Sequence, residues 1–306
     1  NPFDHTRSPG GSSGGAAAAL ASGMVPLEIG SDIGGSIRAP SHMCGVFGHK
    51  PSYGIVPLRG HGFPGTDGLD VPLAVVGPMA RNVADLAATL DIIAGPEGPG
   101  YRLDLPPARQ RELREFRIRV IGEMPGVPVD SDTAAALKGF TSALDDAGVD
   151  VSSSNEDYPD LVRMMEAYIR MLNTVISRGT PDARPIDAHE WMALQDEQLA
   201  VTRQWRRVFD DTDIVVSPIF STPAFIYQTE PDWTKRQILI DGKPFNYGSQ
   251  LSWAGIATYA GLPATAIPVA RTEGGLPIGL QLIGAPFEDR TTLRFAELCE
   301  ATGLTV

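Results

Sequence analysis

Hydrophobic residues recur at helical spacing in several stretches of the chain. In residues 82–94 one recurs every three or four positions, and Gly95 and Pro96 then end the pattern. This spacing places the hydrophobic residues on one face of a helix. The same reasoning predicts further helices over residues 16–22, 131–147, 160–210 and 289–302, with an irregular interruption at residues 179–185.

Short runs of β-branched and other hydrophobic residues predict strands. These runs are residues 118–121, 149–151, 214–216, 264–269 and 278–283. A strand–helix–strand unit over residues 118–151 is typical of parallel strands joined by a crossover helix. Without an internal repeat or a domain linker, the pattern predicts one α/β domain over residues 1–306. We expect a single mixed, mostly parallel β-sheet with helices on both faces.

Charge and cysteine content exclude several classes of function. The net charge of −12 argues against nucleic acid as the ligand, because phosphate binding requires a basic surface. A run of 18 apolar residues, long enough to cross a membrane, does not occur. The two cysteines, Cys44 and Cys299, lack the spacing of a metal site. We therefore expect no nucleic acid, no membrane and no metal as partners, and a reducing compartment, the cytoplasm.

Two clusters of glycine and serine carry the candidate chemistry. GGSSGG contains Ser12, and SDIGGSIR contains Ser36, 24 positions later. Acyl transfer from an amide requires a nucleophile, a proton acceptor and donors for the developing oxyanion. A glycine pair before Ser36 allows a sharp turn that directs successive backbone N–H groups into one concavity. The candidate oxyanion donors are Ile33, Gly34, Gly35 and Ser36.

The proton acceptor is harder to identify from the residues alone. None of the five histidines lies in a diagnostic motif, so a Ser-His-Asp triad is not favoured. The motif around Ser36 also differs from the G-x-S-x-G elbow of α/β-hydrolases. The spacing of the two clusters favours a proton relay through Ser12.

The two clusters and several downstream stretches resemble the amidase signature family. The match begins at GGSSGG and continues through SDIGGSIR to Gly54. It resumes at residues 76–85, 261–264 and 275–281. The resemblance runs over nearly the whole chain, and its first segment is highly specific.

The resemblance implies a role for each matching residue. Ser36 would form the acyl-enzyme, and Ser12 would be a bridging serine that follows a cis peptide bond with Gly11. Gly11 would also border the substrate beside the oxyanion donors. Supporting roles are implied for Asp32, Arg38 and Ser13.

The third catalytic member of the family is a buried, neutral lysine that acts as the base. Burial lowers the pKa of a lysine and makes it usable as a base near neutral pH. The family places it farther upstream of the bridging serine than this chain extends, and the first lysine here is Lys50. Lys50 matches a different position, which we interpret as structural. The resemblance thus predicts an amidase signature domain without its N-terminal segment.

We therefore predict hydrolysis of a small carboxylic acid amide to acid and ammonia or amine, without a cofactor, with a homodimer as the working assembly. One alternative is the glutaminase (A) subunit of a tRNA-dependent amidotransferase, although residues 52–61 look less like that subunit than like free-standing amidases. A second alternative is a catalytically silent fragment that acts as a binding or assembly module.

A stripe of hydrophobic residues on the helix near residue 168 predicts core packing, with the border of an acyl pocket as its alternative. The stripe comprises Met164, Met165, Tyr168, Met171 and Leu172.

Overall fold

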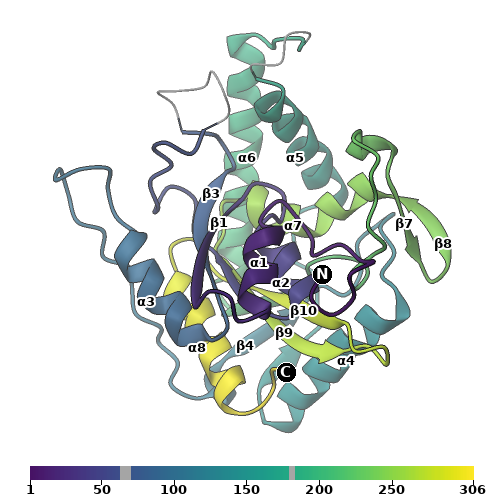
Figure 1. Ribbon diagram of the computed structural model, residues 1–306. Helices are drawn as coiled ribbons and strands as arrows, with labels where there is room; N and C mark the ends of the chain where they lie inside the picture. Colours follow the sequence, from purple (N-terminus) through teal and green to yellow (C-terminus); the bar gives the residue numbers. More distant parts are fainter. Residues whose placement is uncertain (63–69, 179–182) are drawn as a thin grey trace.

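An eight-stranded mixed β-sheet forms the centre of the molecule (Figure 1). The computed structural model describes residues 1–62, 70–178 and 183–306. In spatial order the strands are β1 (Leu27–Asp32), β3 (Val75–Ala80), β2 (Phe47–Lys50), β9 (Ala264–Arg271), β10 (Pro277–Ile283), β6 (Ile214–Pro218), β4 (Arg117–Val120) and β5 (Asp150–Ser152). A separate hairpin contains β7 (Gln237–Ile240) and β8 (Lys243–Asn246).

The sheet is mixed, as the sequence predicts, but it is not mostly parallel. Five of its seven strand pairings are antiparallel, and the two parallel pairings join β4 to β5 and β4 to β6. Only residues 272–276 connect β9 to β10. A parallel pair needs a crossover of a dozen or more residues, so this short turn forces the two strands to be antiparallel. The one strand–helix–strand unit visible in the sequence is therefore not representative of the whole sheet.

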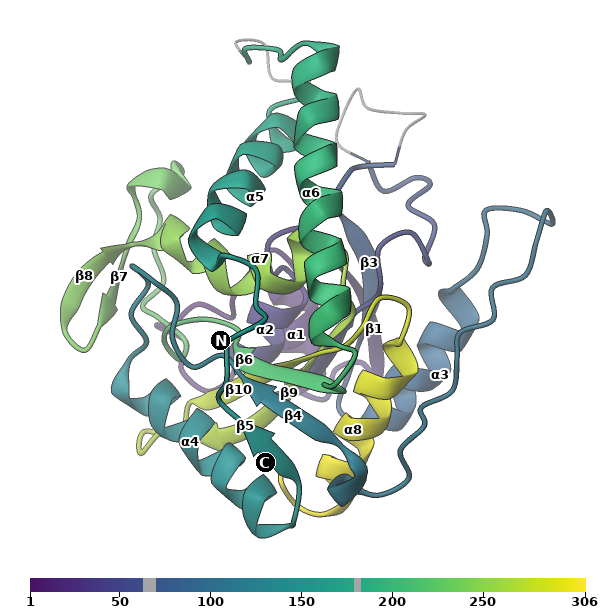
Figure 2. The ribbon, with the colours of Figure 1, turned by 180° about the vertical axis from the view of Figure 1, so that it is seen from behind.

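Helices cover both faces of the sheet, as the sequence predicts (Figures 1 and 2). One face carries α1 (Gly14–Ala21), α2 (Arg38–Cys44) and α7 (Leu251–Tyr259). The other carries α3 (Val83–Ile93), α4 (Ser131–Asp146) and α8 (Asp289–Ala301). The long helices α5 (Leu161–Ile176) and α6 (Ala188–Val208) pack together and project from one end of the molecule in both views.

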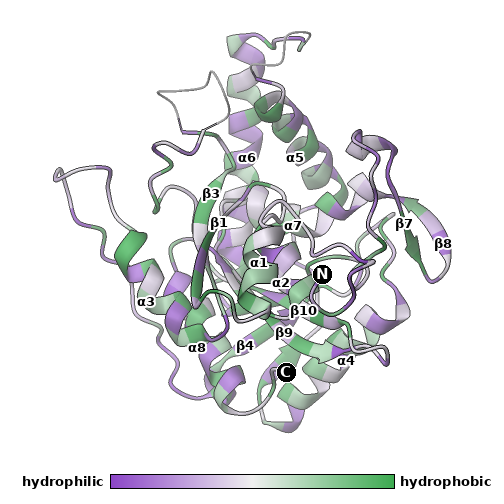
Figure 3. Cartoon of the chain, viewed as in Figure 1, coloured by the Kyte–Doolittle hydropathy of each residue, from purple (hydrophilic) through white to green (hydrophobic). Residues whose placement is uncertain are grey.

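Alternate residues of the central strand β10 face opposite sides of the sheet, with hydrophobic side chains on one side and polar contacts on the other. Ile278, Leu280 and Leu282 are fully buried, and the last two join the hydrophobic cluster beneath α3, α4 and α8. Gly279 and Gln281 face the opposite side, where Gln281 contacts the start of α2. Figure 3 shows the hydrophobic residues concentrated in the central strands and the hydrophilic ones along the exposed sides of α6. One face of β10 thus stabilises the fold while the other reaches polar groups.

Most predicted elements are confirmed, with boundaries that differ by a few residues. The predicted helices over 82–94 and 289–302 correspond to α3 and α8, and the predicted unit 118–151 corresponds to β4, α4 and β5. The hydrophobic pattern does not predict strands β1, β2 and β3 or helices α2 and α7. Residues 179–182 of the predicted interruption lie outside the described residues. In the part of the chain that the structure describes, no helix combines the length and the apolar character needed to cross a membrane.

Candidate active site

Ser36 lies on the tight connection between β1 and α2. The preceding strand ends at Asp32, whose carboxylate is fully buried. This carboxylate accepts hydrogen bonds from the backbone N–H groups of Gly35 at 2.9 Å and Ile37 at 3.1 Å. Asp32 therefore folds the connection back on itself and fixes the backbone on both sides of Ser36.

Arg38 holds Asp32 in place. Its Nε and Nη2 atoms donate to the Asp32 carboxylate at 3.0 and 2.9 Å. Its Nη1 atom donates to the carbonyl of Ala254 at 3.0 Å and to Oε1 of Gln281 at 2.7 Å. Burial opposes ionisation of Asp32, but the Arg38 guanidinium, together with Lys50 and the Gly35 N–H, lowers the pKa of Asp32 to about 2. The ion pair thus ties the loop to both α7 and β10.

The GGSSGG segment is a loop that leads into α1 and lies against the Ser36 loop. The Gly11–Ser12 peptide bond is cis, as the family resemblance implies. The Ser13 N–H donates to the Ser36 carbonyl at 3.2 Å, which brings the two serine clusters side by side. A Cβ on Gly30 would lie 2.7 Å from Ser13 Oγ, so β1 and this loop are in close contact. Ser13 therefore occupies a supporting position between the two clusters.

The two candidate catalytic serines differ in exposure. Ser36 is half-buried, whereas Ser12 and Gly11 are exposed. A Cβ added to Gly11 would meet no atom within 4 Å, so the space beside this backbone is open. The arrangement leaves room on the Ser12 side of the nucleophile.

The structure narrows the set of candidate oxyanion donors. The Gly35 N–H already donates to Asp32 Oδ1 at 2.9 Å, so it serves the loop rather than a ligand. The backbone N–H groups of Ile33, Gly34 and Ser36 remain as candidates. Gly35 has a φ of +96°, a conformation that favours glycine, and a Cβ there would lie 3.0 Å from the Ala254 side chain. The glycine is thus required by the sharp turn and by close packing against α7.

Comparison with known proteins identifies the family of the chain. The family model described as Amidase matches residues 1–178 and 170–293. The chain belongs to the amidase family. It is 31% identical to a glutamyl-tRNA(Gln) amidotransferase subunit of Staphylococcus carnosus, over 97% of this chain and 67% of that protein. It is 32% identical to AmiB2 of Mycobacterium tuberculosis, named as an amidase, over 98% of this chain and 66% of that protein.

The fold of this amidase family chain also matches solved structures. One, described as a vestigial protein complex that reveals the origins of an s-triazine catabolic enzyme, superposes with a TM-score of 0.80 at 27% identity. The match covers 100% of this chain and 69% of the other. The chain therefore spans about two thirds of the length of the relatives it matches. Amide hydrolysis is the activity that the family and the amidase AmiB2 support.

Ser52, outside the two serine clusters of this amidase chain, lies near a histidine and an aspartate, but the order of the three residues is wrong for a catalytic triad. Ser52 Oγ donates to Asp289 at 2.6 Å, and His49 Nε2 lies 3.1 Å from the same carboxylate. In a Ser-His-Asp triad the histidine stands between the other two and receives the serine proton. Here the aspartate stands in the middle, and all three side chains are buried. The cluster instead joins β2 to the start of α8.

Lys50 is buried close to this cluster, and its side chain donates hydrogen bonds to the backbone. Its Nζ donates to the carbonyls of Pro51 at 2.9 Å and Leu262 at 2.7 Å. Burial lowers the pKa of Lys50 to about 7. These contacts support the structural interpretation of Lys50. Among the described residues, no group of three His, Cys, Asp or Glu side chains is placed to hold a metal ion.

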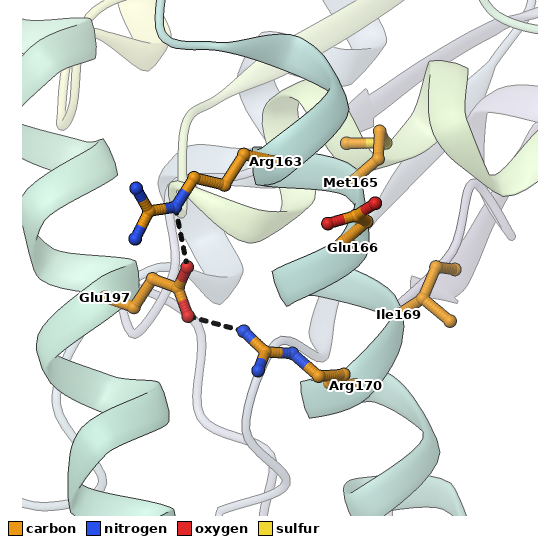
Figure 4. Close-up of a pocket in the computed structure, with 6 residues that line it drawn as sticks. All are labelled: Arg163, Met165, Glu166, Ile169, Arg170 and Glu197. Carbon is orange, nitrogen blue, oxygen red and sulfur yellow. Dashed lines mark hydrogen bonds and ion pairs between the residues drawn. The ribbon is translucent and has the colours of Figure 1, made fainter. Parts of the chain in front are cut away.

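A broad surface hollow of about 810 Å³ lies between α5 and α6 (Figure 4). Glu197 bridges Arg163 at 3.5 Å and Arg170 at 2.6 Å across it. Neither Ser36 nor Ser12 lines this hollow. It is therefore separate from the candidate nucleophile.

Sequence reasoning misses several residues that position the loop. Gln281 lies in a stretch recognised by resemblance, but its contact with Arg38 spans 243 positions. Tyr168 belongs to the stripe predicted to pack in the core, and it is fully buried, yet its hydroxyl donates to the Ile33 carbonyl at 2.8 Å. Both side chains act across long sequence separations, and only their polar character in otherwise hydrophobic surroundings could have indicated them.

Proposed function

We propose that Ser36 is the nucleophile that hydrolyses a carboxylic acid amide. Its Oγ attacks the carbonyl carbon, the C–N bond breaks, and the amine or ammonia leaves with a proton. Water then attacks the acyl-serine ester and releases the acid. The observation that carries this proposal is the doubly fixed loop at Ser36, held by Asp32 from one side and hydrogen-bonded to the Ser12 loop from the other.

Ser12 would relay the Ser36 proton to a base and return it to the leaving amine. Its loop lies beside that of Ser36 through the Ser13–Ser36 hydrogen bond of 3.2 Å. The base in this scheme is the buried lysine that the family resemblance places upstream of Ser12. Lys50 lies downstream, and its Nζ atom donates hydrogen bonds to two backbone carbonyls.

The developing oxyanion would be bound by backbone N–H groups of the same loop. Ile33, Gly34 and Ser36 are the proposed donors, with Gly11 bordering the substrate. Fixed donors stabilise the transition state because no reorganisation is needed when charge develops. The ion pair between Asp32 and Arg38 provides this rigidity.

A second candidate is the glutaminase component of a tRNA-dependent amidotransferase. The 31% identity over 97% of the chain to a glutamyl-tRNA(Gln) amidotransferase subunit favours it. Stable co-purification with larger partners and ammonia release from glutamine would support this candidate; hydrolysis of other amides by the isolated chain would support a free-standing amidase. A catalytically silent binding module is the outcome if neither occurs.

Two further proposals concern the whole protein: its assembly and compartment, and its domain organisation. We propose a homodimer in the cytoplasm; the two free, buried cysteines, Cys44 and Cys299, fit a reducing compartment. We also propose that residues 1–306 form one amidase signature domain, since a single sheet carries helices on both faces.

The proposal predicts that Ser36→Ala abolishes turnover and that Ser12→Ala reduces it severely, by about a thousandfold or more. Ser22→Ala, at an exposed position after α1, serves as the matched control and should leave turnover unchanged. Ammonia or amine release from an amide panel measures all three. Undiminished hydrolysis by the Ser36→Ala protein would refute the mechanism.

A further inference from the structure

Tyr168 is a buried residue that connects α5 to the loop carrying the proposed oxyanion donors. Its hydroxyl donates to the Ile33 carbonyl at 2.8 Å, across 135 positions of sequence. A Cβ on Gly34 would lie 3.4 Å from the same hydroxyl and 2.8 Å from Leu251 Cδ2. The Tyr168 hydroxyl therefore lies directly against the Ile33–Gly34 peptide.

Because a peptide unit is planar, the hydrogen bond to the Ile33 carbonyl also affects the direction of the Gly34 N–H. In a trans peptide the C=O of one residue and the N–H of the next point in opposite directions within one plane. A hydrogen bond that fixes the Ile33 carbonyl toward Tyr168 also fixes the Gly34 N–H on the opposite side. The Gly34 N–H is then free of Tyr168 and points away from α5.

The packing around Tyr168 keeps its ring in a single position. A Cβ on Gly255 of α7 would lie 2.7 Å from Tyr168 Cδ1, so the ring rests directly on the α7 backbone. The Tyr259 ring packs edge-on at a centroid distance of 6.2 Å. Burial, with a smaller contribution from the Asp32 charge, raises the pKa of Tyr168. The hydroxyl therefore stays protonated and remains a donor at neutral pH.

We propose that Tyr168 is a positioning residue of the active site, which orients the Gly34 N–H toward the oxyanion by holding the Ile33 carbonyl. This inference rests on the proposed function of the Ser36 loop. Asp32 fixes the loop through Gly35 and Ile37, and Tyr168 fixes it through Ile33. The two anchors together hold the peptide groups on both sides of the nucleophile.

The chain offers a matched pair of variants for the test. Tyr168→Phe removes the hydroxyl and keeps the ring that packs on α7. Tyr259→Phe removes a neighbouring buried hydroxyl that has no hydrogen-bond partner among the described residues. Each change deletes one buried oxygen. The two variants differ in whether the deleted hydroxyl donates to the Ile33 carbonyl.

The experiment compares the wild-type chain with both variants in two measurements. The first is amide hydrogen exchange in the peptide that contains residues 33–36, which requires no turnover. The second is kcat and KM for amide hydrolysis. Tyr168→Phe should speed exchange several-fold and lower kcat by about 10- to 100-fold with KM within about twofold, because a displaced donor weakens transition-state binding. Tyr259→Phe should match the wild type in both.

Three other results would refute either the positioning role of Tyr168 or the proposed function. Equal exchange and equal kcat in the two variants would refute the positioning role of Tyr168. A raised KM with unchanged kcat would also refute it, because it would assign Tyr168 to substrate binding. A protein that carries the upstream lysine and still hydrolyses no amide would refute the proposed function, while the exchange measurement would still decide whether Tyr168 anchors the loop.

Discussion

At the scale of single residues, the buried pair of Asp32 and Arg38 determines the backbone path around Ser36. Arg38 uses its Nε, Nη1 and Nη2 atoms in hydrogen bonds, to Asp32, Ala254, Gln281 and Thr258. Removing one partner of such a pair leaves an uncompensated buried charge, which costs more than the pair itself contributes. The loop geometry therefore depends on both charges.

This dependence predicts the effect of Asp32→Asn. The substitution keeps the shape of the side chain but leaves the Arg38 charge unpaired and introduces an NH2 group among donors. We expect the free energy of unfolding to fall by about 3 kcal/mol or more, measured by urea denaturation. Asp4→Asn, which breaks the partly exposed ion pair with Arg7, is the control and should change stability much less. Equal losses in the two variants would contradict the assigned role of Asp32.

At the scale of secondary structure, the elements that build the site are those with the weakest patterns in the sequence. Helix α2 has seven residues, including Arg38, Pro40 and His42, and all seven are buried. A helix buried on every side shows no amphipathic stripe, so periodicity does not reveal it. Helices α3 and α8, each with one exposed side, are predicted nearly to the residue.

Strand β2 escapes prediction for a related physical reason. Its residues Phe47 to Lys50 are all buried, yet His49 and Lys50 are polar. Their burial is compensated by Asp289 and by the Leu262 carbonyl, more than 200 positions away. Partners so distant leave no local signal. Ser36 and Ser12, by contrast, are identifiable because glycine spacing and motif lie within one short segment.

At the scale of the whole molecule, buried ionisable groups couple folding to pH. Lys50 is fully buried, and burial lowers its pKa to about 7 from an ordinary value of 10.5. Between these values the unfolded chain binds a proton that the folded chain does not. Stability contributed by this group therefore rises as pH increases through this window.

Comparison with Lys50→Met isolates this contribution. The free energy of unfolding of the wild type minus that of the variant should rise from pH 7 to 9, by up to about 1.4 kcal/mol per pH unit. Urea denaturation at several pH values measures it. Lys138→Met, at an exposed position in α4, is the control and should give no such slope. Parallel curves for the wild type and Lys50→Met would show that Lys50 is protonated in the folded protein.

The most direct test of the central claim is the reaction of the purified chain with a serine-directed fluorophosphonate, followed by intact mass and mapping of the modified residue. If Ser36 is the nucleophile, we expect one adduct, on Ser36, and none in the Ser36→Ala protein. The absence of an adduct in a protein that carries the upstream lysine, or an adduct that persists in Ser36→Ala, would contradict the assignment of Ser36 as the nucleophile.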